Sequence, residues 1–219
     1  VAKENRAEFI ETINRVIRIF IALAIPSAAL LSFVLPPMLD FALGFDPAGT
    51  SLLLWVTRAF LVGLLSHCLL ELGARIFFAQ QNATIPFLAS VINLIAYIAF
   101  GQLLTKPLQA VGVALADAIA FTAQSAFLLI FFYLRTVKSI PQPVGESHTA
   151  ATQQKPFEIS STVLRTLLGS VIGSLVSILI LRYTQNTIPD VVIGILAAIG
   201  GIAAVIPFIH KEIKVLLHL

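Results

Sequence analysis

Six long apolar stretches, separated by short polar breaks, occupy almost the whole chain. Because of them, 58% of the 219 residues are hydrophobic and only 11% are charged. A water-soluble domain of this size cannot bury that much apolar surface, so the surroundings of these stretches are lipid. The stretches cover residues 19–39, 52–79, 86–104, 108–134, 162–183 and 191–209.

The stretches have the properties of membrane helices rather than of membrane strands. Each is close to, or longer than, the roughly 20 residues that an α-helix needs to cross a bilayer. None shows strict two-residue alternation, and a helix satisfies its backbone hydrogen bonds within itself. The predicted fold class is an all-α integral membrane protein, a bundle of about six transmembrane helices.

The basic residues predict how the bundle sits in the membrane. An even number of crossings places both termini on one side, and most of the 14 Lys and Arg residues fall there. The opposite side receives only Arg58, Lys106 and Arg182, and its first loop, 40–51, is acidic. Because excess Lys and Arg mark the cytoplasmic face, both termini are predicted to be cytoplasmic. The net charge of +3 is spread along this rim and implies no nucleic-acid partner.

The chain begins on a charged amphipathic segment and has no signal peptide. After Val1, the residues Phe9, Ile13, Ile17 and Phe20 recur at helical spacing on one side of this segment. A helix that starts in this way suggests a segment cut from a longer polypeptide.

Polar composition divides the chain into three parts. Residues 137–159 are rich in Pro, Ser, Thr and Gln and lack apolar periodicity, which is typical of a flexible cytoplasmic linker. The linker separates four helices in residues 1–136 from a C-terminal helix pair in residues 160–219. In that pair Gly169 and Gly173 stand one turn apart, a spacing that lets two backbones approach closely. Simple helix packing explains this pattern, and a groove for a lipid tail is the alternative.

The second stretch is unusual because it carries several charged or titratable residues. His67, Glu71 and Arg75 follow at intervals of four residues and share one helix face. Charges at membrane depth are costly and are expected to face the bundle interior or a wet cavity. In the structural interpretation, Glu71 and Arg75 form an ion pair at the cytoplasmic rim. In the functional interpretation, this face borders a cavity for an anionic substrate or a coupling ion. Arg58 is then the best phosphate ligand, because no acidic neighbour in its helix neutralises it.

A single carboxylate, Asp117, interrupts the fourth stretch, among small residues. It lies roughly 15 Å from the outer end at the helical rise, and Gln124 follows on nearly the same face. A carboxylate at this depth predicts a proton or cation site, and a protonated or hydrogen-bonded packing residue is the alternative. Asn93, in the middle of the third stretch, is a weaker candidate because interhelical amide hydrogen bonds are common.

The sequence contains no motif of covalent catalysis or of a metal centre. It lacks H-E-x-x-H, a phosphate-binding glycine loop, G-x-S-x-G and a cysteine pair, and its histidines are scattered. The one cysteine, Cys68, lies in an apolar stretch and excludes a disulfide framework or a cysteine metal site within the chain. The prediction is therefore a transporter-like bundle, with no enzymatic activity, no metal and no cofactor.

Short motifs in the first four stretches resemble the MurJ/MviN family of lipid II flippases. In that family a turn of the form Arg-x-Phe-Tyr-Ala-x-x-Asp-x-x-x-Pro joins two helices of the C-terminal lobe. Residues 71–86 resemble this turn, with Phe78 at the usual tyrosine and Asn82 at the usual aspartate. The matching positions are Arg75, Phe77, Ala79, Thr84 and Pro86. Other similar segments are 25–29, Asn93 and 111–115. The last two stretches match only in hydropathy.

The resemblance implies the two-lobed, fourteen-helix flippase fold of the multidrug/oligosaccharidyl-lipid/polysaccharide exporter superfamily, with this chain as its last six helices. It implies that undecaprenyl-pyrophosphate-linked peptidoglycan precursor, lipid II, is translocated across the bacterial cytoplasmic (inner) membrane by alternating access. The implied partners are this precursor, membrane lipids, a coupling ion and the missing N-terminal lobe of the same chain. The candidates for lining the substrate cavity are Arg58, Glu71, Arg75, Asp117 and Asn93.

Three alternatives fit the same residues. A polysaccharide-precursor flippase or a drug/cation antiporter of the same superfamily would share the bundle. Intramembrane arginines upstream of this chain would favour the pyrophosphate lipid over both. A noncatalytic membrane assembly subunit would use the polar residues only to join helices.

Overall fold

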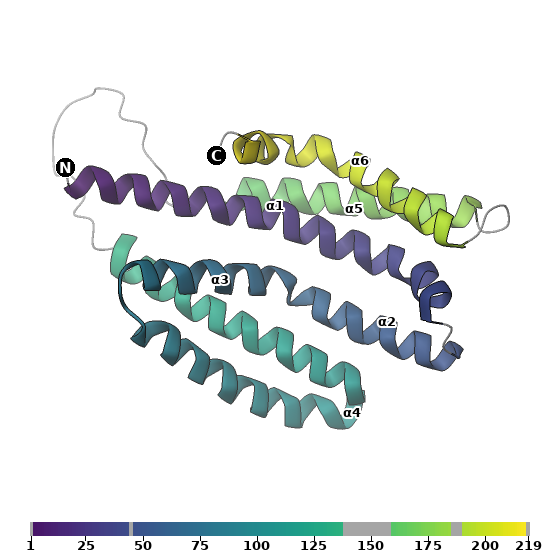
Figure 1. Ribbon diagram of the computed structural model, residues 1–219, viewed down its shortest axis with the longest axis horizontal. Helices are drawn as coiled ribbons and strands as arrows, with labels where there is room; N and C mark the ends of the chain where they lie inside the picture. The colour runs from purple at the N-terminus through teal and green to yellow at the C-terminus, as the bar shows by residue number, and fades with distance from the viewer. Residues whose placement is uncertain (1, 44–45, 138–158, 185–189, 218–219) are drawn as a thin grey trace.

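The computed structural model describes residues 2–43, 46–137, 159–184 and 190–217, and every element in these ranges is a helix. The elements are α1 (Ala2–Leu43), α2 (Pro47–Val62), α3 (Leu64–Ala79), α4 (Thr84–Phe132), the short π-helix η1 (Tyr133–Val137), α5 (Ile159–Thr184) and α6 (Asp190–Leu217). Helix α1 lies between the α5–α6 pair and the layer formed by α2, α3 and α4 (Figure 1). The predicted all-α membrane bundle is confirmed.

Five helical segments of the described residues are long and apolar enough to cross a membrane, judged by length and composition. They are Phe9–Pro36, Pro47–Ala79, Thr84–Arg135, Ser161–Tyr183 and Val192–His210. Four of these segments correspond to the first, second, fifth and sixth apolar stretches of the sequence. The third and fourth stretches both fall in the remaining segment, the longest one.

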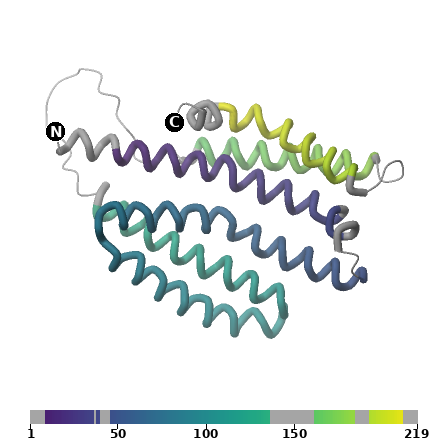
Figure 2. The backbone as a smooth tube through the Cα atoms, viewed as in Figure 1, coloured from purple at the N-terminus to yellow at the C-terminus, as the bar shows by residue number. Residues whose placement is uncertain are grey.

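This segment, Thr84–Arg135 with 52 residues, is folded back on itself as a helical hairpin. A straight helix of that length would span about 78 Å, far more than the roughly 30 Å of hydrocarbon. Helical geometry breaks at Gln109, where φ is 51° and ψ is −128°. The two arms then run side by side in opposite directions (Figures 1 and 2). A hydrogen bond from Gln124 Nε2 to Ser90 Oγ, 3.3 Å long, joins them. The hairpin therefore supplies two crossings, in agreement with the six stretches.

Proline and small residues place the turn of this hairpin. Pro107 has no N–H to donate and restricts the backbone before it, so a regular helix does not continue through it undisturbed. Just after the turn, a β-carbon on Gly112 would lie 2.2 Å from the carbonyl oxygen of Leu104. Small buried residues follow along the second arm: Ala114, Ala116, Ala118 and Ala120. They let neighbouring helices come close to this arm.

The second stretch, predicted as one span over 52–79, consists of two helices. Helices α2 and α3 meet at Gly63, whose N–H bonds to the carbonyl of Phe60 at 2.9 Å in a 3₁₀-type turn. A β-carbon on Gly63 would lie 3.0 Å from the α-carbon of Ala118. The bend thus coincides with a close backbone contact between this stretch and α4, which hydropathy does not encode.

Helix α1 contains the amphipathic segment and the first apolar stretch without interruption. Ile13 and Ile17 on its predicted apolar side are buried. Phe9 packs against the same core, with its ring centroid 6.4 Å from that of Phe132. The other members of this core include Ile76, Phe77, Ile85, Ala89 and Leu128. One apolar face of α1 therefore shares a core with α3 and with residues of both arms of α4.

The sequence predicts a loop over 40–51 and a linker over 137–159, and the structure describes most of the first of these regions. The loop predicted over 40–51 is shorter, because α1 extends to Leu43 and α2 begins at Pro47. The linker predicted over 137–159 lies outside the described residues except for its two end residues. The division of the chain into four helices, a linker and a helix pair therefore stays a prediction.

Helices α5 and α6 pack against each other through their small residues. A β-carbon on Gly169 would lie 2.8 Å from the side chain of Phe208, and one on Gly173 would lie 2.6 Å from that of Val205. Each glycine site is thus occupied by a side chain of the partner helix. This observation supports helix packing, the first of the two interpretations of the glycine spacing.

We expect Gly112→Ala to destabilise the α4 hairpin, because the new methyl group would meet the backbone of Leu104, which cannot rotate away. Overpacking of this kind costs about 1–3 kcal/mol. The measurement is the thermal unfolding midpoint of the detergent-solubilised protein, which should fall by several degrees. Gly101→Ala is the matched control, since no atom lies within 4 Å of a β-carbon there. Equal midpoints for the two variants would contradict the close approach of the arms at Gly112.

Candidate functional site

A row of titratable side chains, here named the polar stripe, runs along α3 and onto α4; it consists of Arg75, Glu71, His67 and Asp117. The first three lie on one face of α3 because they are four residues apart. Arg75 Nε lies 3.3 Å from Glu71 Oε2, so the predicted ion pair forms. The two side chains are 80% and 72% exposed, which places the pair on the surface of the helix layer.

Asp117 has a neighbour that its position in the sequence does not indicate. Helix α3 brings His67 to it, with 3.8 Å between His67 Nε2 and Asp117 Oδ2. This distance is too long for a hydrogen bond, and the contact is an ion pair only when His67 carries a proton. The ring of Phe121 packs against the imidazole, with 4.0 Å between the ring centroids. The second and fourth apolar stretches therefore share one polar contact at this point.

A pair of hydroxyl groups fixes α3 and α4 next to that contact. Ser66 Oγ and Thr122 Oγ1 lie 2.8 Å apart. Thr122 uses its single hydroxyl proton in a bond to the carbonyl of Ala118, 2.7 Å away. Ser66 is therefore the donor and Thr122 the acceptor in the bond between the helices.

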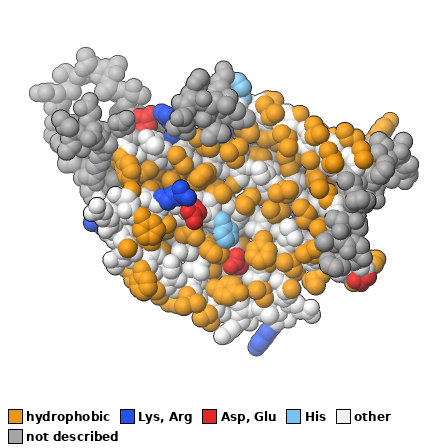
Figure 3. Space-filling model, viewed as in Figure 1, with side chains coloured by type: hydrophobic (Ala, Val, Ile, Leu, Met, Phe, Trp, Pro, Cys, Tyr) orange, Lys and Arg blue, Asp and Glu red, His pale blue; other side chains and the backbone are white. Residues whose placement is uncertain are grey.

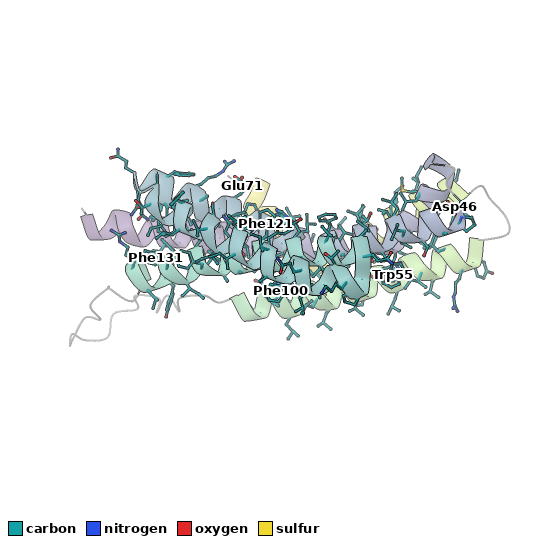
Figure 4. All side chains as sticks on the ribbon, turned by 90° about the horizontal axis from the view of Figure 1, so that it is seen from below. Asp46, Trp55, Glu71, Phe100, Phe121 and Phe131 are labelled. Atoms are coloured by element: carbon teal, nitrogen blue, oxygen red, sulfur yellow. The ribbon has the colours of Figure 1, made fainter. Side chains whose placement is uncertain are left out.

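The polar stripe lies on one face of the bundle, among apolar side chains. Figure 3 shows a row of basic, acidic and histidine side chains crossing a largely hydrophobic surface. Along the length of the helices, Glu71 and Phe121 lie between Asp46 near one end and Phe131 toward the other (Figure 4). These helices belong to segments long and apolar enough to cross a membrane, and Glu71 and Phe121 lie away from both ends of the bundle along this direction (Figure 4).

Arg58, predicted as a phosphate ligand, is bonded to the backbone of α1. Its Nε and Nη2 groups donate to the carbonyl oxygen of Ser32 at 3.2 Å and 3.0 Å. That carbonyl lacks its usual helical partner, because four residues later stands Pro36, which has no N–H. The guanidinium also lies over the ring of Trp55, 5.1 Å from its centroid. Arg58 thus satisfies a backbone group that a proline in the neighbouring helix has left open.

The remaining candidate, Asn93, lies in the first arm of the α4 hairpin. Its Nδ2 is buried and has no hydrogen-bond partner within the described part of the chain. The polar link between the arms is made by Gln124 and Ser90 instead, and Ser90 Oγ in turn donates to the carbonyl of Pro86 at 3.0 Å. Asn93 therefore keeps an amide donor inside the hairpin that no described residue uses.

The structure brings three of the five predicted site residues together, Glu71, Arg75 and Asp117, and places Arg58 and Asn93 elsewhere. The residue that the sequence analysis left without a role is His67. Its four-residue spacing from Glu71 was the available signal, whereas its contact with Asp117 depends on how α3 packs on α4. In the ranges that the structure describes, no three His, Cys, Asp or Glu side chains are grouped so as to hold a metal ion. The stripe thus consists of one ion pair, Glu71 with Arg75, and one contact between helices, His67 with Asp117.

The chain matches a protein-family model. The model is described as lipid II flippase MurJ, and it matches residues 1–199. This range includes the whole polar stripe as well as the other two predicted site residues. No curated protein matches the chain.

We expect Arg58→Met to destabilise the bundle, because it leaves the part-buried carbonyl of Ser32 without the donor that replaces the missing N–H of Pro36. An unsatisfied buried polar group costs about 1–3 kcal/mol. The measurement is the free energy of unfolding in mixed micelles, compared with that of the wild-type protein.

Two further variants make this prediction specific. Pro36→Ala restores the missing N–H, so Arg58→Met should cost less in the Pro36→Ala background. Arg75→Met removes an exposed arginine of the stripe and should change stability by no more than about 0.5 kcal/mol. If Arg58→Met costs the same in both backgrounds, the bond to Ser32 is not what Arg58 contributes.

Proposed function

The chain belongs to the lipid II flippase MurJ family, and we propose that its polar stripe forms part of the wall along which the lipid II headgroup crosses the membrane. The family and the apolar helices together make it a multi-pass inner-membrane protein that acts on lipid II. We propose a path for the headgroup, the residues that line it and a mechanism of transport.

The chemistry of the cargo supports this path. A headgroup with a pyrophosphate cannot cross hydrocarbon unaided, because charge is costly at membrane depth. Its polyprenyl tail can remain in lipid throughout. A flippase therefore needs a polar surface at membrane depth that is open toward the headgroup. The polar stripe supports such a path, since its side chains are partly or mostly exposed and lie within the segment that the family model matches. This observation carries the proposal.

The candidate residues take different roles in this proposal. Arg75, Glu71 and Asp117 line the path and set its charge. Arg58 acts as an anchor that holds α2 against α1, as its bonds to the backbone of α1 indicate. Asn93 adds an amide donor within the hairpin.

We further propose that transport proceeds by alternating access. The helices α1, α3 and α4 share one packed core, and packed cores move as rigid bodies. In this scheme the present helices move against an upstream lobe, which supplies the cationic part of the path, and a coupling ion drives the cycle. The path then opens toward the cytoplasm and toward the outside in turn.

Removing the arginine of the stripe tests the proposed path. Arg75→Gln is expected to slow lipid II flipping by about tenfold, equivalent to roughly 1.4 kcal/mol of lost attraction for the headgroup. The intact protein is produced in cells depleted of their own flippase, and lipid II in the outer leaflet is quantified with an impermeant reagent. Lys106→Gln is the matched control, because Lys106 is an exposed cation near the hairpin turn and lies off the stripe. Normal flipping by Arg75→Gln at normal membrane levels would favour a role of the stripe in joining helices only.

The orientation predicted from the basic residues can be tested by thiol labelling. The turn between α3 and α4 is expected to face the cytoplasm, and the connection between α1 and α2 the outside. Gln81→Cys should therefore react with an impermeant maleimide only after the inner membrane is opened, whereas Asp46→Cys should react in intact spheroplasts. Both positions are exposed, and replacing the single native cysteine, Cys68, with Ser removes background reaction. The opposite labelling pattern would reverse the predicted topology.

A further inference from the structure

The polar stripe has a charge balance that is unfavourable for the cargo proposed above. It holds one arginine, Arg75, and two carboxylates, Glu71 and Asp117. With His67 neutral, the net charge of the stripe is therefore −1, which repels a pyrophosphate headgroup. Histidine is the side chain whose charge changes most readily near neutral pH. Proton uptake by His67 is thus the simplest way for the stripe to lose its net charge.

Within the described ranges, the carboxylate of the stripe that has no Lys or Arg partner is Asp117, beside His67. Arg75 is paired with Glu71 at 3.3 Å, whereas Asp117 faces His67 Nε2 at 3.8 Å. On the neighbouring α2, Arg58 is bonded to the backbone of α1. Among the described residues, no ion pair or hydrogen bond joins His67 to a charged group of α1 or α2. The groups that set the charge at His67 are therefore Asp117 of α4 and the ion pair along α3.

The geometry leaves the contact between His67 and Asp117 open. At 3.8 Å the two atoms are near each other but not hydrogen-bonded. Phe121 covers one side of the imidazole. The two side chains are 42% and 26% exposed, so a proton can reach them from the face of the stripe. A proton on His67 Nε2 turns this contact into a charge-assisted hydrogen bond after a small rotation of either side chain.

A proton fits this site better than a metal ion does. A transition-metal ion requires several ligands, and the described residues contain no group of three His, Cys, Asp or Glu side chains that could hold one. One imidazole and one carboxylate are enough to hold a proton, and the neighbouring hydroxyl groups of Ser66 and Thr122 are already bonded to each other.

We propose that His67 and Asp117 form a proton-binding site whose occupancy is linked to binding of the anionic headgroup. This inference rests on the proposed function, because it takes the stripe as part of the headgroup path. Proton uptake by His67 brings the net charge of the stripe from −1 to zero, so the protonated stripe accepts the headgroup more readily. The bound headgroup in turn retains the proton. By linkage, each ligand strengthens the binding of the other by the same factor.

The test measures binding of a lipid pyrophosphate at two pH values. The intact flippase is reconstituted in nanodiscs, and its Kd for undecaprenyl pyrophosphate is determined at about pH 6 and about pH 8. The titration of the probe itself affects all variants equally and cancels when their Kd ratios are compared. The affinity gain at the lower pH should be about fivefold or more larger in the wild type than in His67→Gln, an ordinary coupling between linked sites. Asp117→Asn should bind tightly at both pH values, because it removes the repelling charge permanently.

The controls separate this inference from the proposed function. His210→Gln removes an exposed histidine of α6, away from the stripe, and should keep the wild-type pH ratio. The inference is overturned if His67→Gln and Asp117→Asn, both folded, keep that ratio as well. If one of the two does not fold, the other decides. Absence of probe binding at either pH, by the wild type too, would instead contradict the proposed function.

Discussion

The bilayer offers no hydrogen bonds, and the construction of the bundle depends on this constraint. A backbone group that leaves the regular helical pattern must find its partner inside the protein. Pro36 frees the carbonyl of Ser32, and Arg58 reaches that carbonyl from the neighbouring helix. At Gly63 the N–H turns to the carbonyl of Phe60, so the bend between α2 and α3 keeps a bond. Both irregularities thus keep their hydrogen bonds inside the protein. Gly63 lies in the stretch that carries most of the polar stripe, and Pro36 lies in the helix that packs against that stretch.

The crossings could be predicted from hydropathy, because lipid sets the length and apolarity of each helix separately. The predicted stretch 162–183 lies within α5, and 191–209 lies within α6. Bends could not be predicted in this way. Gly63 is an ordinary helix residue until Ala118 of α4 packs against it. The two arms of the hairpin were predicted as separate stretches because a short polar break divides the apolar sequence there, and Pro107 lies in that break.

Polar partners on one helix were predictable, whereas partners on different helices were not. The spacing of Glu71 and Arg75 alone indicates their ion pair, which the structure contains. The contact of Asp117 with His67 depends on the packing of α3 against α4, which no local pattern encodes. Arg58 shows the same dependence, because its contact is decided by a proline in another helix. The lack of an acidic neighbour in its own helix led to the prediction of a phosphate ligand. In the structure its guanidinium is bonded to the backbone of the neighbouring helix.

The polar contacts between helices differ in length: some are within hydrogen-bond distance and one is not. Arg58 is bonded to α1, Ser66 to Thr122, and the arms of α4 to each other, all at hydrogen-bond distance. The contact between His67 and Asp117 is not, at 3.8 Å. Changing a completed contact breaks a hydrogen bond where water cannot replace it, whereas changing an open contact can add one. Among these contacts, the one between His67 and Asp117 is therefore the one that can gain a hydrogen bond, while the bond between Ser66 and Thr122 joins α3 to α4 beside it. If the polar stripe lines the proposed headgroup path, such a seam would let the path change its charge without unpacking the helices.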